Sequence, residues 1–215
     1  MAKSEQIGSV KLVNVRLSFA SLFEPNVQKN DDGSERKTWK SNFLIPKKGD
    51  DSKRLLALLK KAKNEVMAKK YGDDEKKWPK IKKERMFLRD GDEEDWDGYE
   101  GNWYVSANSP LERRPRVITN RKDKNGHWID AEPGERGCPY SGCYVNAIIR
   151  VWVQDNEHGR RVNASLEAVQ FRADGEPFGA APVDVDDAFD DDDVGDEGEI
   201  DDIDEDDEDE DDDII

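Results

Sequence analysis

Residues 144–154 alternate between two kinds of side chain, and one of the two sets is suited to binding. One face is continuously apolar and consists of Val145, Ala147, Ile149, Val151 and Val153. The opposite face mixes aromatic rings with a guanidinium and amides, in Tyr144, Asn146, Ile148, Arg150, Trp152 and Gln154. Nucleobases stack on aromatic rings for about 1–3 kcal/mol each, and cationic side chains follow the phosphates. This face therefore predicts contacts to single-stranded nucleic acid from Tyr144, Arg150 and Trp152.

The same mixture of rings and cations recurs elsewhere in the chain. It is found at Trp39-Lys40, at Arg113-Arg114 with Arg116, and at Trp128 beside Arg121, Lys122 and Lys124. We therefore expect further contacts from Trp39, Lys40, Arg113, Arg114, Arg116 and Trp128. Each ring could equally belong to a second core layer or to a dimer contact, because aromatic side chains dominate cores and interfaces alike.

The charge of the chain is divided unevenly along its length. The 215 residues carry a formal net charge of −17, with 34 basic and 51 acidic side chains. Residues 183–215 hold 22 of the acids and no Lys or Arg, so residues 1–182 carry 34 basic against 29 acidic groups, or +5. The sequence thus predicts one mildly basic domain over residues 1–182, followed by a polyanion.

The acidic segment 183–215 is predicted to be disordered, because like charges at this density repel and cannot offset the entropy of ordering. Tethered to a basic domain, it is a built-in competitor for the surface that binds phosphates. The chain ends with an apolar pair after a run of pure charge, which predicts a short partner-binding peptide made of Asp211, Asp212, Asp213, Ile214 and Ile215.

The remaining pattern predicts a mainly-β domain with one helix, compatible with a small barrel. Strands are expected at residues 13–19, 38–45, 85–89, 103–107, 115–119, 144–154 and 161–172, with a two-residue hairpin turn at Asn125-Gly126. A helix is expected at about 52–71, capped by Asp51 or Ser52 and ended by Gly72. Its apolar side chains recur at three- and four-residue spacing, in Leu55, Leu58, Leu59, Ala62, Val66 and Met67.

Several classes of protein are disfavoured by what the sequence contains. No apolar run is long enough for a membrane span or a signal peptide, so a cytoplasmic location is expected. Cys138, Cys143, His127 and His158 lack zinc-ligand spacing, and the acidic stretch from Glu93 has Tyr104 where a calcium loop needs Glu. Phosphate-binding and nucleophile motifs are absent. We therefore expect no enzyme, no metal and no cofactor.

An ordered set of segments resembles the bacteriophage single-stranded DNA-binding proteins of OB-fold type. The segments are residues 41–47, 88–92, 104–109, 140–147, 165–171 and 174–179, so the resemblance spans about residues 7–180. It implies a five-stranded barrel with one helix, a homodimer, and a tail that contacts the phage DNA polymerase and helicase-primase. Relatives tend to end in Phe, whereas this chain ends in Ile214-Ile215, so partner identity does not follow from the resemblance.

Together these observations predict sequence-tolerant, non-enzymatic binding of single-stranded DNA in phage replication, recombination and repair. Two other classes stay open at this point. An acidic chaperone or DNA mimic would use the tail to bind basic proteins, and a metal-dependent nuclease would use some of the many carboxylates.

Overall fold

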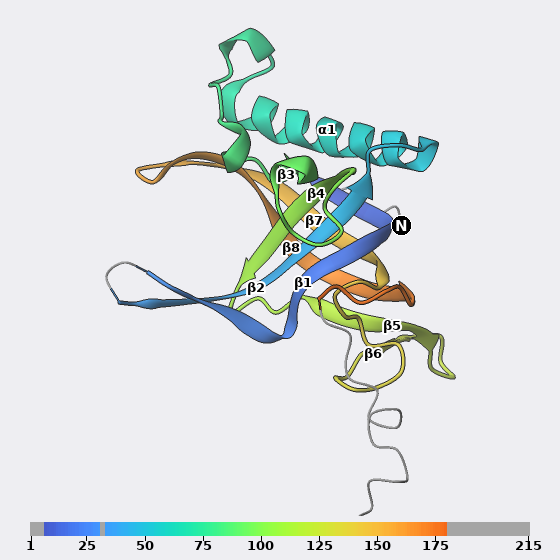
Figure 1. Ribbon diagram of the computed structural model, residues 1–215. Coiled ribbons are helices and arrows are strands. Elements are labelled where there is room, and N and C mark those ends of the chain that lie inside the picture. Colours follow the sequence, from blue (N-terminus) through green and yellow to red (C-terminus); the bar gives the residue numbers. More distant parts are fainter. Residues whose placement is uncertain (1–6, 31–32, 180–215) are drawn as a thin grey trace, which may run out of the picture. The chain divides into compact units, whose positions relative to one another are not determined.

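Figure 1 shows the computed structural model, which describes residues 7–30 and 33–179. The chain divides into two units, Met1–Ala180 and Ala181–Ile215. The second unit contains the whole predicted acidic tail, residues 183–215, and it lies outside the described residues. The first unit holds all the candidate DNA contacts and is described by itself below.

The described residues of the first unit form eight strands, one long helix and three short 3₁₀ turns. The strands are β1 (Ser9–Lys29), β2 (Glu35–Pro46), β3 (Leu88–Asp90), β4 (Asn102–Pro110), β5 (Arg116–Lys122), β6 (Trp128–Asp130), β7 (Tyr144–Asn156) and β8 (Gly159–Ala173). The helix is α1 (Asp50–Tyr71), and the 3₁₀ turns are η1 (Glu75–Lys77), η2 (Lys83–Arg85) and η3 (Gly91–Glu93). In the described part of the chain, no helix is both long and apolar enough to cross a membrane.

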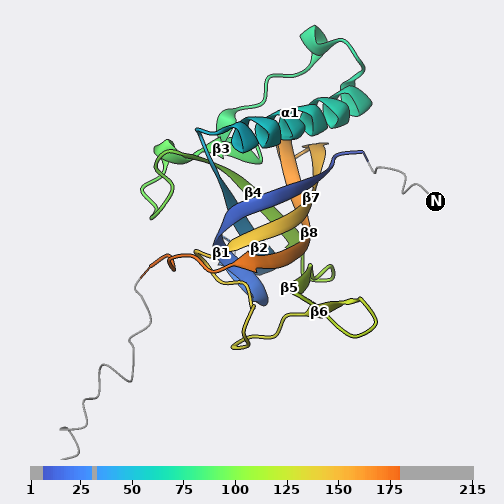
Figure 2. The same cartoon turned by 90° about the vertical axis from the view of Figure 1, so that its right-hand side faces the viewer.

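Five of the strands close into a barrel, as the family resemblance implies. The sheet order is β3-β4-β2-β1-β7-β8-β5-β6, and an additional parallel pairing joins β4 to β8. This pairing, between Asn108 and Ser165, completes the ring of β1, β2, β4, β8 and β7. Figures 1 and 2 show α1 lying over one end of this ring, while β5 and β6 project at the other end. The OB-like barrel is therefore confirmed, with one α-helix among the described residues.

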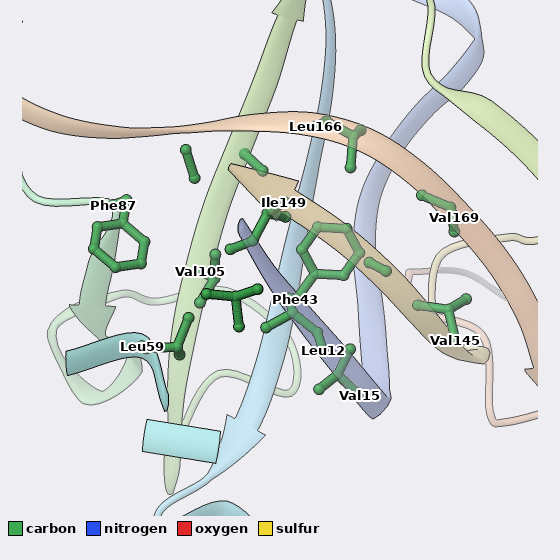
Figure 3. Close-up of a cluster of buried hydrophobic side chains, with 14 of the residues drawn as sticks. Leu12, Val15, Phe43, Leu59, Phe87, Val105, Val145, Ile149, Leu166 and Val169 are labelled. Atoms are coloured by element: carbon green, nitrogen blue, oxygen red, sulfur yellow. The ribbon is translucent and has the colours of Figure 1, made fainter. Parts of the chain in front are cut away.

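The barrel encloses one main hydrophobic core. Figure 3 shows Phe43 of β2, Val105 of β4, Ile149 of β7 and Leu166 of β8 meeting inside the barrel. The predicted apolar face of β7 is confirmed, since Val145, Ala147, Ile149 and Val151 are buried and Val153 packs partly buried against the core. Strands facing a closed interior must alternate inward and outward side chains, so the same pattern that fills the core fixes which side chains reach the surface.

The alternation predicted for residues 13–19 is wrong at both ends. Val13 and Phe19 are 55% and 46% exposed, although Val15 and Leu17 are buried. The pairing register shifts next to each of them, and Asn14 and Phe19 have positive φ angles of 51° and 48°. A bulge inserts a residue into one strand and turns the following side chain to the other face, so strict alternation in the sequence does not survive here.

Helix α1 begins two residues earlier than predicted. Its N-cap is Gly49 and no side chain caps it, so the expected capping by Asp51 or Ser52 is wrong. Gly72 ends the helix as predicted, with its N–H donating to the carbonyl of Ala68 at 2.7 Å. Leu55 and Leu59 pack into the core, whereas Leu58 is exposed, because it lies on the lysine-rich side of the helix.

Two further predictions need correction. The expected strand at residues 85–89 is reduced to β3, because η2 occupies the positions before it. The hairpin turn at Asn125-Gly126 is longer than two residues, since Lys122 pairs with Trp128. The Asp123 carboxylate accepts hydrogen bonds from the N–H groups of Asn125 and His127, which stabilises the longer loop.

The adjacent isoleucines of β7 test this description of the barrel. Ile149 is fully buried and Ile148 is 42% exposed. Ile149→Ala is expected to lower the free energy of unfolding by about 2–5 kcal/mol, because shortening a buried side chain leaves a cavity in the core. Ile148→Ala, the matched control, should change it by about 0.5 kcal/mol or less. Urea denaturation followed by circular dichroism measures both, and equal losses would contradict the assigned faces.

Candidate nucleic-acid interface

Strand register brings four outward-facing polar side chains together across the barrel. Lys40 of β2 pairs with Asn108 of β4, and Asn108 pairs with Ser165 of β8. Ser165 pairs in turn with Arg150 of β7. Neighbouring strands lie about 4.8 Å apart, so the four positions span about 14 Å. We call Lys40, Asn108, Ser165 and Arg150 the polar belt.

The belt faces outward because both sequence neighbours of each member are buried. These buried neighbours are Trp39, Ser41, Ala107, Ser109, Ala164, Leu166, Ile149 and Val151. Two of the predicted contacts, Lys40 and Arg150, are therefore placed at the two ends of one continuous surface. The belt is also roughly perpendicular to the strands, since it follows the hydrogen-bonding direction.

Three predicted cations meet beside the belt in a small cavity of about 240 Å³. We call this cavity the arginine pocket; its lining residues are Ser109, Arg113, Arg114, Arg150, Ser165, Leu166 and Glu167. Ser109 is buried and its hydroxyl donates to the carbonyl of Leu166 at 2.5 Å, which holds β4 against β8. The pocket therefore lies at the seam that closes the barrel.

The Nε–H group of Arg150 has no hydrogen-bond acceptor among the described residues. Its Nη2 donates to Glu167 Oε2 at 3.0 Å, while its buried Nε has no hydrogen-bond partner among the residues described. An unsatisfied buried donor is unfavourable by about 1–3 kcal/mol. An anionic oxygen entering the pocket would face three guanidinium groups at once.

Trp39 lies beneath the surface rather than on it. Its side chain is only 6% exposed, its Nε1 donates to the carbonyl of Leu111 at 3.1 Å, and the Arg114 guanidinium lies 5.2 Å from its ring centre. Arg114 also lies 5.9 Å from the ring centre of Phe23. The predicted stacking of a base on Trp39 has no open ring face in this arrangement. Trp39 instead supports Arg114 by a cation–π contact.

Arg116 and Trp128 form a separate group on the projecting β5–β6 hairpin. Arg116 Nε donates to Asp130 Oδ1 at 2.7 Å, and its Nη2 donates to the carbonyl of Trp128. Lys122 lies 4.6 Å from the exposed ring of Trp128. Exposed ion pairs of this kind contribute little to stability, about 0–1 kcal/mol. Arg116 can therefore leave Asp130 and bind a phosphate with little loss of free energy.

Tyr144 and Trp152 lie at opposite ends of the outer face of β7. They are eight residues apart, which corresponds to about 27 Å along a strand. Between them, Asn146 is buried, donates to Gln170 and accepts from the N–H of Asn14, so it serves the structure of the barrel. The structure therefore places Trp152 two residues from Arg150, and places Tyr144 away from the arginine pocket.

An acidic loop closes the neighbouring face of the barrel. The loop 90–101 lies over β1, β2 and β4, where the Tyr99 hydroxyl accepts from Asn42 and donates to Ser18. Lys47 bonds both Asp90 and Asp92 and anchors the loop, and these bonds lower the pKa of both carboxyl groups. Because the loop is rich in carboxylates, phosphates are repelled there.

Sequence reasoning missed the roles of Ser165 and Glu167. Both belong to the polar side of a predicted strand, which gives no signal for an anion pocket. Residues 7–30 and 33–179 contain no group of three His, Cys, Asp or Glu side chains that could hold a metal ion.

Comparisons with known proteins find several relatives of this chain. Residues 8–200 match the model of the family described as the ssDNA-binding protein of Enterobacter phage Enc34. The putative protein p50 of Acyrthosiphon pisum secondary endosymbiont phage 1 is 41% identical over 186 residues, covering 85% of this chain and 92% of that protein.

Two solved structures are also similar. The single-stranded DNA-binding protein of bacteriophage Enc34 in complex with ssDNA is 28% identical with a TM-score of 0.62, covering 80% of this chain and 90% of that chain. A C-terminal truncation of the same phage protein is 29% identical with a TM-score of 0.62, covering 80% of this chain and 88% of that one. The matched family is a class of DNA-binding proteins and not of enzymes, in agreement with the sequence-based expectation. The chain therefore belongs to the family of the single-stranded DNA-binding protein of Enterobacter phage Enc34.

Proposed function

We propose that this protein binds single-stranded DNA without sequence preference and without catalysing a reaction. The observation that carries the proposal is the arginine pocket, where Arg113, Arg114 and Arg150 converge and one buried guanidinium donor has no partner among the described residues. The related Enc34 protein was solved in complex with ssDNA. Such a pocket suits one phosphate of a strand, and the exposed ring of Trp152 beside it suits a base.

The strand crosses the barrel along the polar belt. Lys40, Arg113, Arg114 and Arg150 contact phosphates, while Trp152 stacks on a base and Trp128, with Arg116 and Lys122, extends the surface on the hairpin. Tyr144 contacts the strand only where it passes the far end of β7. Stacking accepts every base, so the binding is tolerant of sequence.

The proposal includes a role for the tail, which lies outside the described residues. Its 22 acids compete with DNA phosphates for the basic surface, and its last residues, Asp211, Asp212, Asp213, Ile214 and Ile215, recruit the phage DNA polymerase and helicase-primase. In this way the protein serves replication, recombination and repair of phage DNA in the host cytoplasm. The proposal also includes a homodimer, which the family resemblance implies and sedimentation velocity tests directly.

One binding assay separates this function from its rivals. Fluorescence anisotropy with labelled oligo-dT, with duplex DNA as competitor, should show binding that duplex displaces poorly and that falls with salt. The labelled strand should remain intact with Mg²⁺ present. Degradation that stops in EDTA would indicate a nuclease, and absence of binding would favour an acidic chaperone or DNA mimic.

Arg150 and Glu167 provide a test with opposite signs. Arg150→Gln removes a charge-assisted hydrogen bond worth about 1.5–3 kcal/mol, so affinity for oligo-dT should fall roughly tenfold or more. Glu167→Gln removes the carboxylate that holds Arg150 and faces the phosphate, so affinity should rise. The control is Glu157→Gln, an equal charge change at an exposed carboxylate outside the pocket. If Glu167→Gln and Glu157→Gln give the same affinity, the pocket does not bind a phosphate.

Removal of the tail tests the proposed competition. Deleting residues 184–215 should tighten binding to oligo-dT, and the gain should shrink as salt screens the charges. Anisotropy titrations at two ionic strengths measure the effect, with a chain of the same length in which the tail acids are replaced by Asn and Gln as the control. Unchanged or weaker binding after truncation would contradict the competition.

A further inference from the structure

A second cavity lies on the other side of Arg150, between the last turns of α1 and β7. Its volume is about 560 Å³, more than twice that of the arginine pocket. We call it the helix cleft; its lining residues are Ile7, Val66, Lys69, Lys70, Arg150, Val151, Trp152 and Val153. Of these residues only Arg150 and Trp152 belong to the contacts predicted from the sequence.

The helix cleft combines an apolar base with a cationic rim. Val66 and Val151 are buried, and the ring of Trp152 is 41% exposed. Among the described residues, the three charged side chains that line the cleft are Lys69, Lys70 and Arg150, all of them cationic. An apolar wall with an open aromatic ring suits a nucleobase, and a rim of cations suits its phosphate.

The surrounding segment carries the positive charge of the domain. Residues 53–85 contain 13 basic and 5 acidic side chains, a formal charge of +8. Because residues 1–182 carry +5 in total, the rest of that region is net negative by 3. A polyanion approaching the domain is therefore attracted toward the side that holds α1 and the helix cleft.

The helix end itself would repel a phosphate. The C-terminus of a helix carries a partial negative charge, and Lys69 and Lys70 lie in the last turn of α1. Any phosphate bound there must be held by cationic side chains and not by the backbone. The helix cleft thus depends on the lysines more strongly than a helix N-terminal site would.

The cleft is continuous with the proposed strand path. Arg150 lines both cavities, and Arg150 and Trp152 project from the same face of β7 about 7 Å apart. A strand that leaves a phosphate in the arginine pocket can therefore place its next base against Trp152.

We infer that the helix cleft binds the next nucleotide of the bound DNA strand, with its base on Trp152 and its phosphate between Lys69 and Lys70. This inference rests on the proposed function, and it adds α1 to the binding surface. It also assigns a binding role to two lysines that are otherwise indistinguishable from the many others on the helix.

The lysines are tested in the full-length protein with a matched control. Lys69→Gln/Lys70→Gln removes the two rim charges, and Lys60→Gln/Lys61→Gln removes two charges nine residues earlier on the same helix, about 14 Å away. Each phosphate contact to single-stranded DNA contributes about 0.7 to the slope of log affinity against log salt. The slope for oligo-dT should fall by about 1.4 in the first variant and by much less in the second.

The ring is tested by its fluorescence. Binding of oligo-dT should quench Trp152, so Trp152→Ala should lose part of the total quenching and weaken binding, while Trp152→Phe should restore affinity without restoring the quenching. Circular dichroism checks that each variant is folded. If both lysine pairs change the slope equally, or if Trp152→Ala leaves affinity and quenching intact, the inference is wrong while the proposed function stands. If the unaltered protein does not bind oligo-dT, both fail.

Discussion

A single parallel pairing, between Asn108 of β4 and Ser165 of β8, turns an open sheet into a closed barrel. The buried hydroxyl of Ser109 reinforces this seam by donating to the carbonyl of Leu166. Closure removes the edges along the two strands and forces their side chains to alternate between core and solvent. The arginine pocket exists because the chain leaves β4 at this seam and brings two arginines back over β8. The binding surface is therefore a consequence of closure and not an addition to it.

The charged residues are distributed unevenly around the barrel. The acidic loop 90–101, anchored by Lys47, packs through Tyr99 against Ser18 of β1, Asn42 of β2 and Tyr104 of β4. The basic segment 53–85 lies on the side of α1 and the tip of the β7–β8 hairpin, where the Tyr71 hydroxyl donates to Asp155. The net charge of the whole chain, −17, conceals this arrangement. What directs a strand to its site is the separation of charge within the domain.

Local patterns were sufficient to predict β7, α1 and the class of fold, because periodicity is a property of neighbouring residues. They were not sufficient for the bulges at Asn14 and Phe19, which reverse the alternation of β1 through backbone conformation. The polar belt could not be predicted either, since its members come from four strands distant in sequence and meet only through register. For Trp39 a signal was available: adjacent residues of a strand point to opposite faces, so Trp39 and Lys40 could not both reach the surface.

The polar belt is specified by backbone hydrogen bonds, and the side chains at its four positions contribute almost nothing to the core. The barrel can therefore exchange these side chains while keeping its interior unchanged. By contrast, a one-residue slip of β7 would bring Ile149 to the surface and turn Arg150 inward. Substitutions can thus change the surface charge, and with it the affinity for a ligand, without disturbing the core. An insertion in a strand cannot, because it shifts core side chains to the surface.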